Sequence, residues 1–343
     1  MGLVRRARAL LIALVALTLL GACGRGEEVA VTPTAPSAGE SAPVRGETLP
    51  GRLLFVRQGV IWQWQGREAR PLLGAGEAFQ PAWSPEGERI AYIARSNSFS
   101  DLLLADARGA PLAQLTTNGT DAPPNSIERV YASRWVFYPA WTPTAGSIVV
   151  AAQPRPPAGD PPADYNLGLA LVPTTPGDLL PLYADDTAQI GRSAVGPDGS
   201  MIVFTRAGMG PQGQQQLYRL GLNGGAAEPF PGAPLPSYDP AFSPDGRWLA
   251  FAARDGDRTD IFLLPVEGGT PQRLTNHGAA RAPAFSPDGA QLAFLGVAPG
   301  ERGFDLWLTD LSLGEAGALE VSPPRRLTTG LGLDGDSGLS WAP

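Results

Sequence analysis

The sequence of 343 residues is long enough for a large hydrophobic core, and it carries a formal net charge of −7. It contains 43 Gly and 36 Pro but only 17% charged residues, which predicts many turns and strands rather than solvated helices. A single histidine (His277) and a single cysteine (Cys23) exclude multi-histidine metal sites, disulfide frameworks and thiolate zinc clusters.

The first 22 residues have the features of an export signal. Three arginines precede an apolar stretch, Ala9 to Leu20, that is too short to span a membrane comfortably. We therefore predict that residues 1–22 are a signal peptide. Its removal takes three of the 26 basic residues and none of the 33 acidic ones, so the net charge becomes −10. So acidic a chain is not expected to have a nucleic-acid partner.

The segment Leu20-Gly21-Ala22-Cys23 resembles the lipobox of bacterial lipoproteins, in which an aliphatic residue and two small residues precede a cysteine. The resemblance implies cleavage before Cys23, a diacylglyceryl group on its sulfur and an acylated amino terminus. Several acyl chains give stable anchoring, so a membrane outside the cytoplasm becomes the expected partner of this end. The alternative is an ordinary secretory signal whose cleavage site contains a cysteine.

Residues 23–50 contain no aromatic side chain and are rich in Pro, Gly, Ala, Ser, Thr and Glu. Such a segment buries too little apolar surface to offset the entropy lost on ordering. We predict a disordered tether between the lipidated cysteine and a folded domain over residues 51–343.

One repeated sequence fills the rest of the chain. Pro240–Phe251 (PAFSPDGRWLAF) recurs as Pro283–Phe294 and as Pro81–Tyr92, and weaker copies begin at Pro139 and Val195. The prolines of the repeated turn lie 43 to 58 residues apart, close to the length of a four-stranded propeller blade. These prolines are Pro85, Pro143, Pro197, Pro244, Pro287 and Pro343.

Each repeat is predicted to form four short strands. The second and third are nearly continuous apolar runs, such as Ile148–Ala152, which is typical of strands buried on both faces. Gly338–Pro343 has the pattern of a first strand, and residues 52–56, 60–64 and 69–73 have the patterns of a second, third and fourth. We predict an all-β fold, a six-bladed β-propeller of four-stranded antiparallel blades closed by pairing the N- and C-terminal strands.

This pattern resembles the TolB-like, WD-repeat-like β-propeller family of bacteria over roughly residues 50–343. The resemblance rests on Phe242–Gly246 with Arg273–Thr275, and on Phe285–Gly289 with Arg326–Thr328. It implies the propeller but does not specify the function. Residues 24–50 leave no room for the α/β domain of TolB, which argues against its Tol–Pal role, and no hydrolase domain is expected.

Two long insertions, over residues 118–137 and 153–166, are predicted to lie on the same face of the propeller. Tyr, Trp and Arg dominate the energetics of protein interfaces. We therefore expect a patch there that binds a protein or small-ligand partner. Its candidate residues are Arg129, Tyr131, Arg134, Trp135 and Tyr165. The alternative is that the loops fold over their blade and bury these aromatic side chains.

Acidic residues form two groups. Asp-x-Asp runs suggest a hard cation such as calcium, but no EF-hand spacing follows them; they comprise Asp255, Asp257, Asp334 and Asp336. The recurrence of Asp101, Asp260 and Asp305 just before third strands instead predicts carboxylates that accept backbone N–H bonds in a turn. We predict no metal and no cofactor.

No catalytic residue is predicted. His277 is expected to lie in a surface loop, and no Gly-x-Ser-x-Gly elbow accompanies it. The first functional prediction is a lipid-anchored, non-enzymatic binding propeller of the cell envelope. One alternative is a propeller enzyme of the lyase, lactonase or glycosidase type that uses channel carboxylates. The other is a sensor of extracytoplasmic sugars or peptides.

Overall fold

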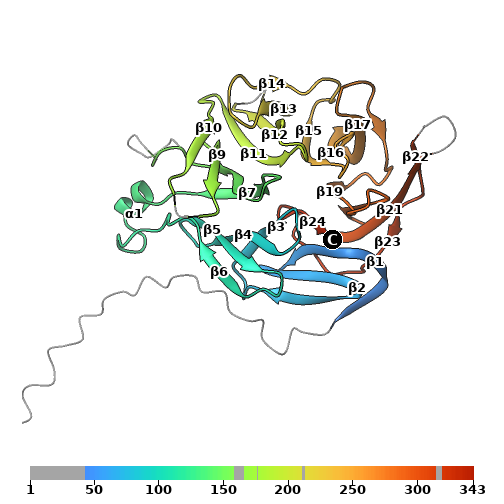
Figure 1. Ribbon diagram of the computed structural model, residues 1–343, viewed down its shortest axis with the longest axis horizontal. Coiled ribbons are helices and arrows are strands. Elements are labelled where there is room, and N and C mark those ends of the chain that lie inside the picture. The colour runs from blue at the N-terminus through green and yellow to red at the C-terminus, as the bar shows by residue number, and fades with distance from the viewer. Residues whose placement is uncertain (1–42, 158–165, 176, 211–212, 314–318) are drawn as a thin grey trace, which may run out of the picture. The chain divides into compact units, whose positions relative to one another are not determined.

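The computed structural model describes residues 43–157, 166–175, 177–210, 213–313 and 319–343. Their strands form six antiparallel sheets arranged as the blades of a β-propeller (Figure 1), so the predicted all-β, six-bladed fold is confirmed. One short helix, α1 (Ile127–Ala132), occurs among these residues. No helix in the described ranges has the length and apolar character needed to cross a membrane.

Four blades pair four consecutive strands each, from the channel outward. Blade 1 comprises β3 (Ala78–Trp83), β4 (Arg89–Arg95), β5 (Ser100–Asp106) and β6 (Pro111–Gln114). Blade 2 comprises β7 (Val136–Trp141), β8 (Ser147–Ala152), β9 (Gly168–Pro173) and β10 (Leu180–Tyr183). Blade 3 comprises β11 (Ala188–Val195), β12 (Met201–Gly208), β13 (Gln215–Gly221) and β14 (Glu228–Pro229). Blade 4 comprises β15 (Ser237–Phe242), β16 (Trp248–Asp255), β17 (Arg258–Pro265) and β18 (Gln272–Arg273).

The last two blades depart from this plan. In blade 5 the outer position is shared by two short strands that both pair with the third strand. Its strands are β19 (Ala280–Phe285), β20 (Gln291–Gly296), β21 (Asp305–Leu313), β22 (Leu319–Val321) and β23 (Arg325–Arg326). Blade 6 joins the two ends of the chain through β24 (Ser340–Ala342), β1 (Val44–Arg57) and β2 (Val60–Leu73).

The predicted pairing of the two ends is confirmed. Leu53 lies opposite Trp341 in the β1–β24 ladder, and the Trp341 indole N–H donates to the Pro50 carbonyl at 2.6 Å. The Arg52 Nε atom also donates to the Pro343 carbonyl at 2.8 Å. The ring is therefore held by backbone and side-chain bonds between residues almost three hundred positions apart, and neither end of the sheet array is left unpaired there.

Two details of this sixth blade correct the predictions. Residues 69–73 are not a separate fourth strand, because β2 continues through Gly66, at φ +60°, and its second half pairs with the start of β1. Val44–Pro50, predicted as the end of the tether, likewise belong to β1. Burial of Leu49 and an ion pair between Glu47 and Arg325, at 2.8 Å, fix this segment against blade 5.

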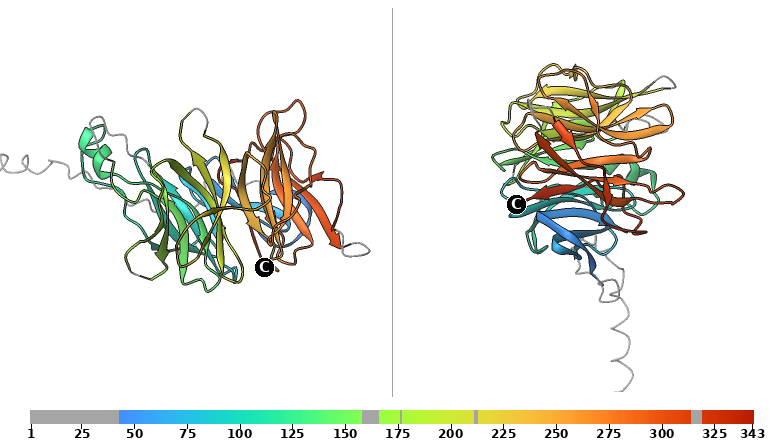
Figure 2. Two further views of the ribbon diagram at one scale, coloured as in Figure 1. Left: turned by 90° about the horizontal axis from the view of Figure 1, so that it is seen from above. Right: turned by 90° about the vertical axis from the view of Figure 1, so that its right-hand side faces the viewer.

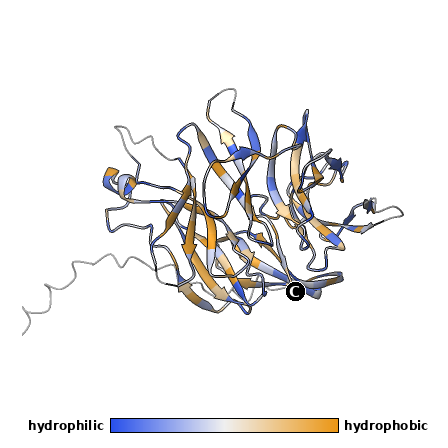
Figure 3. Ribbon diagram, turned by 45° about the horizontal axis from the view of Figure 1, so that its top comes forward, coloured by the Kyte–Doolittle hydropathy of each residue, from blue (hydrophilic) through white to orange (hydrophobic). Residues whose placement is uncertain are grey.

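The hydrophobic core lies between neighbouring blades. The second strands β4, β8 and β20 are buried at every position but the edges, as their continuous apolar sequences predict. A cluster between blades 2 and 3, for example, brings Val149 against Ile190 and Phe204. In Figure 3 the apolar colour accordingly concentrates in the strands and the polar colour in the loops.

The repeated Ser-Pro-Asp-Gly turn is self-contained. In blade 4 the Ser243 hydroxyl donates to Asp245 at 2.6 Å and accepts the Trp248 N–H at 3.0 Å, while Gly246 takes φ +71°. Blade 5 repeats the same bonds. These turns share one face with the C-terminus, whereas α1 and its loop lie at the opposite end of the short axis (Figure 2, left).

Candidate functional site

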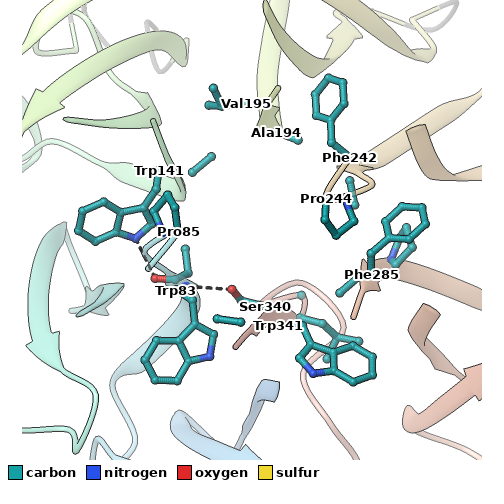
Figure 4. Close-up of a pocket in the computed structure, with 18 of the residues that line it drawn as sticks. Trp83, Pro85, Trp141, Ala194, Val195, Phe242, Pro244, Phe285, Ser340 and Trp341 are labelled. Atoms are coloured by element: carbon teal, nitrogen blue, oxygen red, sulfur yellow. Dashed lines mark hydrogen bonds between the residues drawn. The ribbon is translucent and has the colours of Figure 1, made fainter. Parts of the chain in front are cut away.

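A cavity of about 500 Å³ opens at the centre of the Ser-Pro-Asp-Gly face. The first strand of every blade lines it, with the aromatic side chains of five blades placed around the opening (Figure 4). We call this cavity the mouth pocket. Prolines from each blade's turn or terminal segment surround it: Pro85, Pro143, Pro197, Pro244, Pro287 and Pro343.

Most side chains that line the mouth pocket are apolar, and its prolines are rigid. Proline has a fixed φ and no backbone N–H, so each ring adds apolar surface without an unsatisfied donor. Two polar contacts tie lining residues to one another. The Trp83 backbone N–H donates to the Ser340 hydroxyl at 2.8 Å, and the Trp141 indole donates to the Ala82 carbonyl at 2.9 Å. The wall therefore suits an apolar group.

Four inner strands contain a bulge at the inner end of this pocket. The residue before the first-strand proline takes a left-handed conformation in each, with φ between 51° and 55°. These residues are Gln80, Tyr138, Asp239 and Ala282. A left-handed conformation is costly for residues other than glycine and is typical of functional or tightly constrained positions. Three of the four contribute to a polar cluster in the channel.

Asp239 is the most buried charge of this cluster, with a side chain only 5% exposed. It accepts two bonds from the Arg281 guanidinium, at 2.9 and 3.3 Å, and the Ala282 N–H at 3.2 Å. Burial alone would raise the pKa of this carboxyl, but the positive charges of Arg281 and Arg192 lower it below its usual value. Asp239 is thus an ionised, fully occupied acceptor.

Asp336 forms the second half of the cluster. Its carboxylate accepts the Tyr138 hydroxyl at 3.0 Å and the Gln80 amide at 3.3 Å. The side-chain oxygen Oε1 of Gln80 in turn accepts the Tyr138 backbone N–H at 2.8 Å. Burial, followed by the Asp336 charge, raises the pKa of Tyr138 far above neutrality, so the phenol remains a hydrogen-bond donor.

Arg192 connects the two halves. Its Nη2 atom donates to the Asp336 backbone carbonyl, its Nε lies 3.4 Å from Asp239 Oδ1, and its guanidinium stacks 5.0 Å from the Tyr138 ring centre. Arg192 and Asp239 both line the mouth pocket. The inner end of the pocket therefore carries a guanidinium group beside a carboxylate.

The structure brings together only some of the residues predicted to bind a partner on the long loops. We call this predicted set, Arg129, Tyr131, Arg134, Trp135 and Tyr165, the long-loop patch. Arg129 lies in α1 and is used internally, since it donates to the Ser98 hydroxyl at 2.9 Å and to the Thr120 and Ala122 carbonyls. Trp135 is half-buried and stacks on Phe137 with ring centres 5.7 Å apart.

The remaining members of that patch differ in exposure. The Arg134 side chain is exposed, and Tyr131 is half-buried on α1. Tyr165, like Cys23, lies outside the described residues.

The recurring aspartates confirm the prediction of a structural role. Asp260 accepts the Thr275 hydroxyl and the His277 and Gly278 N–H groups, and Asp305 accepts the equivalent Thr328 hydroxyl and two loop N–H groups. Asp101 does the same with Thr116 and Asn118. Within the described ranges, no group of three or more His, Cys, Asp or Glu could hold a metal ion.

His277 does not fit the predicted surface position. Its ring is half-buried and packs edge-on against Trp307, with centres 4.3 Å apart. Gly296 makes the space, because a Cβ there would lie 2.7 Å from His277 Nε2. Burial lowers the pKa of this histidine, against the opposing charge of Asp260.

Sequence reasoning missed the channel cluster. Of its members only Asp336 stood out, as part of an Asp-x-Asp run. An alignment of the repeats carries a usable signal, because blade 3 alone has a cation, Arg192, at the position that is Gln80, Tyr138, Asp239 or Ala282 in four other blades.

Comparisons with known proteins confirm the fold class. No family model matches the sequence. TolB from Acinetobacter baumannii is 19% identical with a TM-score of 0.51, and the match covers 70% of this chain and 54% of that one. A putative TolB from Agrobacterium tumefaciens is 16% identical with a TM-score of 0.53, over 85% of this chain and 98% of that one. The chain thus has a TolB-like propeller fold.

Two further matches show how widely this architecture is shared. A chain from a nidogen/laminin complex is 11% identical with a TM-score of 0.54, over 85% of this chain and 98% of that one. A curated relative, the uncharacterized peptidase YuxL of Bacillus subtilis (strain 168), is 29% identical over 84 residues. That match spans 23% of this chain and 13% of the relative's length.

Proposed function

We propose that this chain is a lipid-anchored, extracytoplasmic binding protein whose propeller takes a ligand or a segment of a partner protein at the mouth pocket. The observation that carries the proposal is the pocket itself, about 500 Å³ in volume, to which every blade contributes its first strand. Pockets of this size that combine apolar side chains with placed polar groups are typical ligand sites.

The channel carboxylates favour binding over catalysis. A glycosidase-type general acid must hold a proton near neutral pH, which requires a raised pKa. The pKa of Asp239 is lowered instead, and both of its oxygens are occupied by Arg281. Asp336 accepts from Tyr138 and Gln80. Both carboxylates therefore accept structural hydrogen bonds from other residues of the channel.

Site-specific photo-crosslinking tests the mouth pocket as the binding site. A photoreactive phenylalanine at Ala194 in the pocket should crosslink a discrete species in intact cells. The same group at Leu112, exposed on the outer strand β6, is the matched control and should not yield that species. Equal crosslinking from both positions, or none from Ala194, would contradict the proposed site.

The anchor is tested separately. We expect labelled palmitate to enter the protein, and Cys23→Ala to abolish both labelling and membrane association, since no other cysteine is present. Membrane association that survives Cys23→Ala would refute lipidation without affecting the binding proposal.

The enzyme alternative makes a different prediction. Turnover of a lactone or polysaccharide from a substrate panel would support it if Asp336→Asn abolished that turnover while leaving the melting temperature unchanged. Asp336 is the suitable position because its side chain is half exposed, whereas neutralising Asp239 would leave Arg281 buried without its partner.

The long-loop patch is a second candidate for a protein partner. Its support is exposure: Ile127 on α1 is 54% exposed and the Arg134 side chain faces solvent. The double variant Trp135→Ala with Tyr131→Ala should abolish partner capture with unchanged melting if the patch binds. Loss of folding would instead show that these rings serve the blade.

A further inference from the structure

Arg192 is the one cation at the bulge position of the inner strands. Counted from the proline of the repeated turn, it aligns with Gln80, Tyr138, Asp239 and Ala282 in blades 1, 2, 4 and 5, each five residues before that proline. Blade 3 places Arg192 there, between the shifted pairs of Ile190 and Ser193, and blade 6 places Gly338 there. Ala282 and Gly338 show that the strand does not need a charged side chain at this point, so the blade fold does not require a cation.

The Arg192 side chain reaches across the channel. Blades 3 and 6 face each other in a ring of six, and Arg192 Nη2 donates to the carbonyl of Asp336, just before β24 of blade 6. Gly338 leaves the necessary room, because a Cβ there would lie 2.5 Å from Arg192 Nη1. The guanidinium is thereby held at a fixed place at the inner end of the mouth pocket, with the side chain 17% exposed.

The neighbouring carboxylates leave one donor group of this cation unused. Arg192 Nε forms an ion pair with Asp239 at 3.4 Å, while Asp239 takes its close hydrogen bonds from Arg281 and Ala282. The Asp336 carboxylate accepts from Tyr138 and Gln80. The Nη1 group of Arg192 makes no hydrogen bond to any residue that the structure describes.

We propose that Arg192 is an anion subsite of the mouth pocket, and that the ligand is an apolar group ending in a carboxylate. This inference rests on the proposed binding function. The wall of prolyl and alanyl side chains suits the apolar part, and the free Nη1 donors suit a carboxylate oxygen through charge-assisted hydrogen bonds. The low exposure of the guanidinium strengthens such a bond relative to one on the surface.

Paired probes test the charge on the unaltered full chain. Calorimetric titration compares 3-phenylpropanoate with its amide, and the N-acetylated tripeptide Ala-Pro-Phe with its C-terminal amide. Each acid should bind about tenfold to a hundredfold more tightly than its amide. The two pairs distinguish a small organic acid from a chain end as the source of the carboxylate. Binding of the acids should weaken with added salt.

Variants test the residue. Arg192→Leu removes the charge but keeps an apolar side chain, and it should reduce the preference for acid over amide to near unity, with amide binding retained. Arg70→Leu, which removes an exposed surface arginine paired with Glu68, is the matched control and should leave the preference intact. If Arg192→Leu fails to fold, Arg192→Gln provides the same test.

The outcomes separate this inference from the proposed function. Equal affinity for acid and amide, or an acid preference that survives Arg192→Leu, overturns the anion subsite while leaving the mouth pocket as a binding site. Failure of all four probes to bind also overturns it, and the photo-crosslink from Ala194 then decides the proposed function independently.

Discussion

At the scale of single residues, His277 links pH to stability. Burial lowers its pKa below the ordinary value of 6.5, so the folded state disfavours the protonated ring and the unfolded chain binds the proton more readily. The contribution of the neutral His277 ring to the free energy of unfolding is therefore complete above about pH 6.5. It is lost as the pH falls toward the lowered pKa of the folded state. The slope is at most about 1.4 kcal/mol per pH unit for one group.

We predict that the melting temperature falls between pH 7 and pH 5 and that His277→Phe removes this dependence. Phenylalanine keeps the ring against Trp307 and, because Nε2 has no partner, loses only the hydrogen bond of the imidazole to the Val297 backbone. The chain has a single histidine, and the resolved carboxyl shifts are all downward, so they act mainly below about pH 5. An unchanged slope in His277→Phe would contradict this account.

At the scale of elements, a buried aspartate on the third strand binds the end of the outer strand in blades 1, 4 and 5. In blade 4 the outer strand β18 has two residues, and Asp260 on β17 accepts the hydroxyl of Thr275 and two backbone N–H groups just beyond it. These contacts explain why Arg-Leu-Thr recurs at the end of the repeat. Its threonine bonds the aspartate, and its arginine forms an ion pair with the same carboxylate.

Asp260→Asn should destabilise the protein by about 2–3 kcal/mol, because an amide offers one acceptor oxygen where the carboxylate offers two, in a side chain only 1% exposed. Asp255→Asn is the matched control. Its side chain is 77% exposed and lies 3.7 Å from the same arginine, Arg273, so a change below about 0.5 kcal/mol is expected. Urea unfolding of both variants provides the measurement, and equal effects would contradict the argument.

The sequence predicted these elements well where the repeat is regular. Continuous apolar runs correctly predicted the central strands, such as β8. The recurrence of Asp101, Asp260 and Asp305 correctly predicted carboxylates that accept backbone N–H bonds in turns. Prediction failed where tertiary contacts override local pattern. Residues 69–73 continue β2 because Gly66, with its positive φ, lets the strand bend and continue where a turn between two strands was predicted.

The candidate site was harder to predict than the fold. Arg192 meets Asp336 only because two opposite blades face one axis, and no local sequence pattern encodes a contact across 144 positions. His277 was misplaced for a similar reason, since its burial depends on the missing side chain of Gly296 in another strand.

At the scale of the whole molecule, stability depends on joining the two ends. Truncation after Gly338 removes β24 and leaves the Arg52–Leu54 edge of β1 unpaired. We expect the truncated chain to lose cooperative unfolding and to aggregate, because an exposed strand edge templates intermolecular pairing. Light scattering and thermal melting measure both effects.

A peptide of residues 339–343 with one preceding glycine should partly restore the melting transition, whereas a scrambled peptide should not. Restoration would show that the missing strand, and not some other consequence of truncation, causes the defect. A truncated chain that melts like the intact one would contradict a role for β24 in holding the ring.

The pairing of Leu53 with Trp341 also sets an order of events during biosynthesis. The earliest strand to leave the ribosome must wait for the last to emerge before its sheet is complete. Until then five blades can form while one edge of β1 remains unpaired. Such a state is prone to aggregation, as expected of slowly folding proteins with non-local strand pairing. A cell that makes this protein must therefore prevent the unpaired edge of β1 from associating with other chains during nearly the whole of its synthesis.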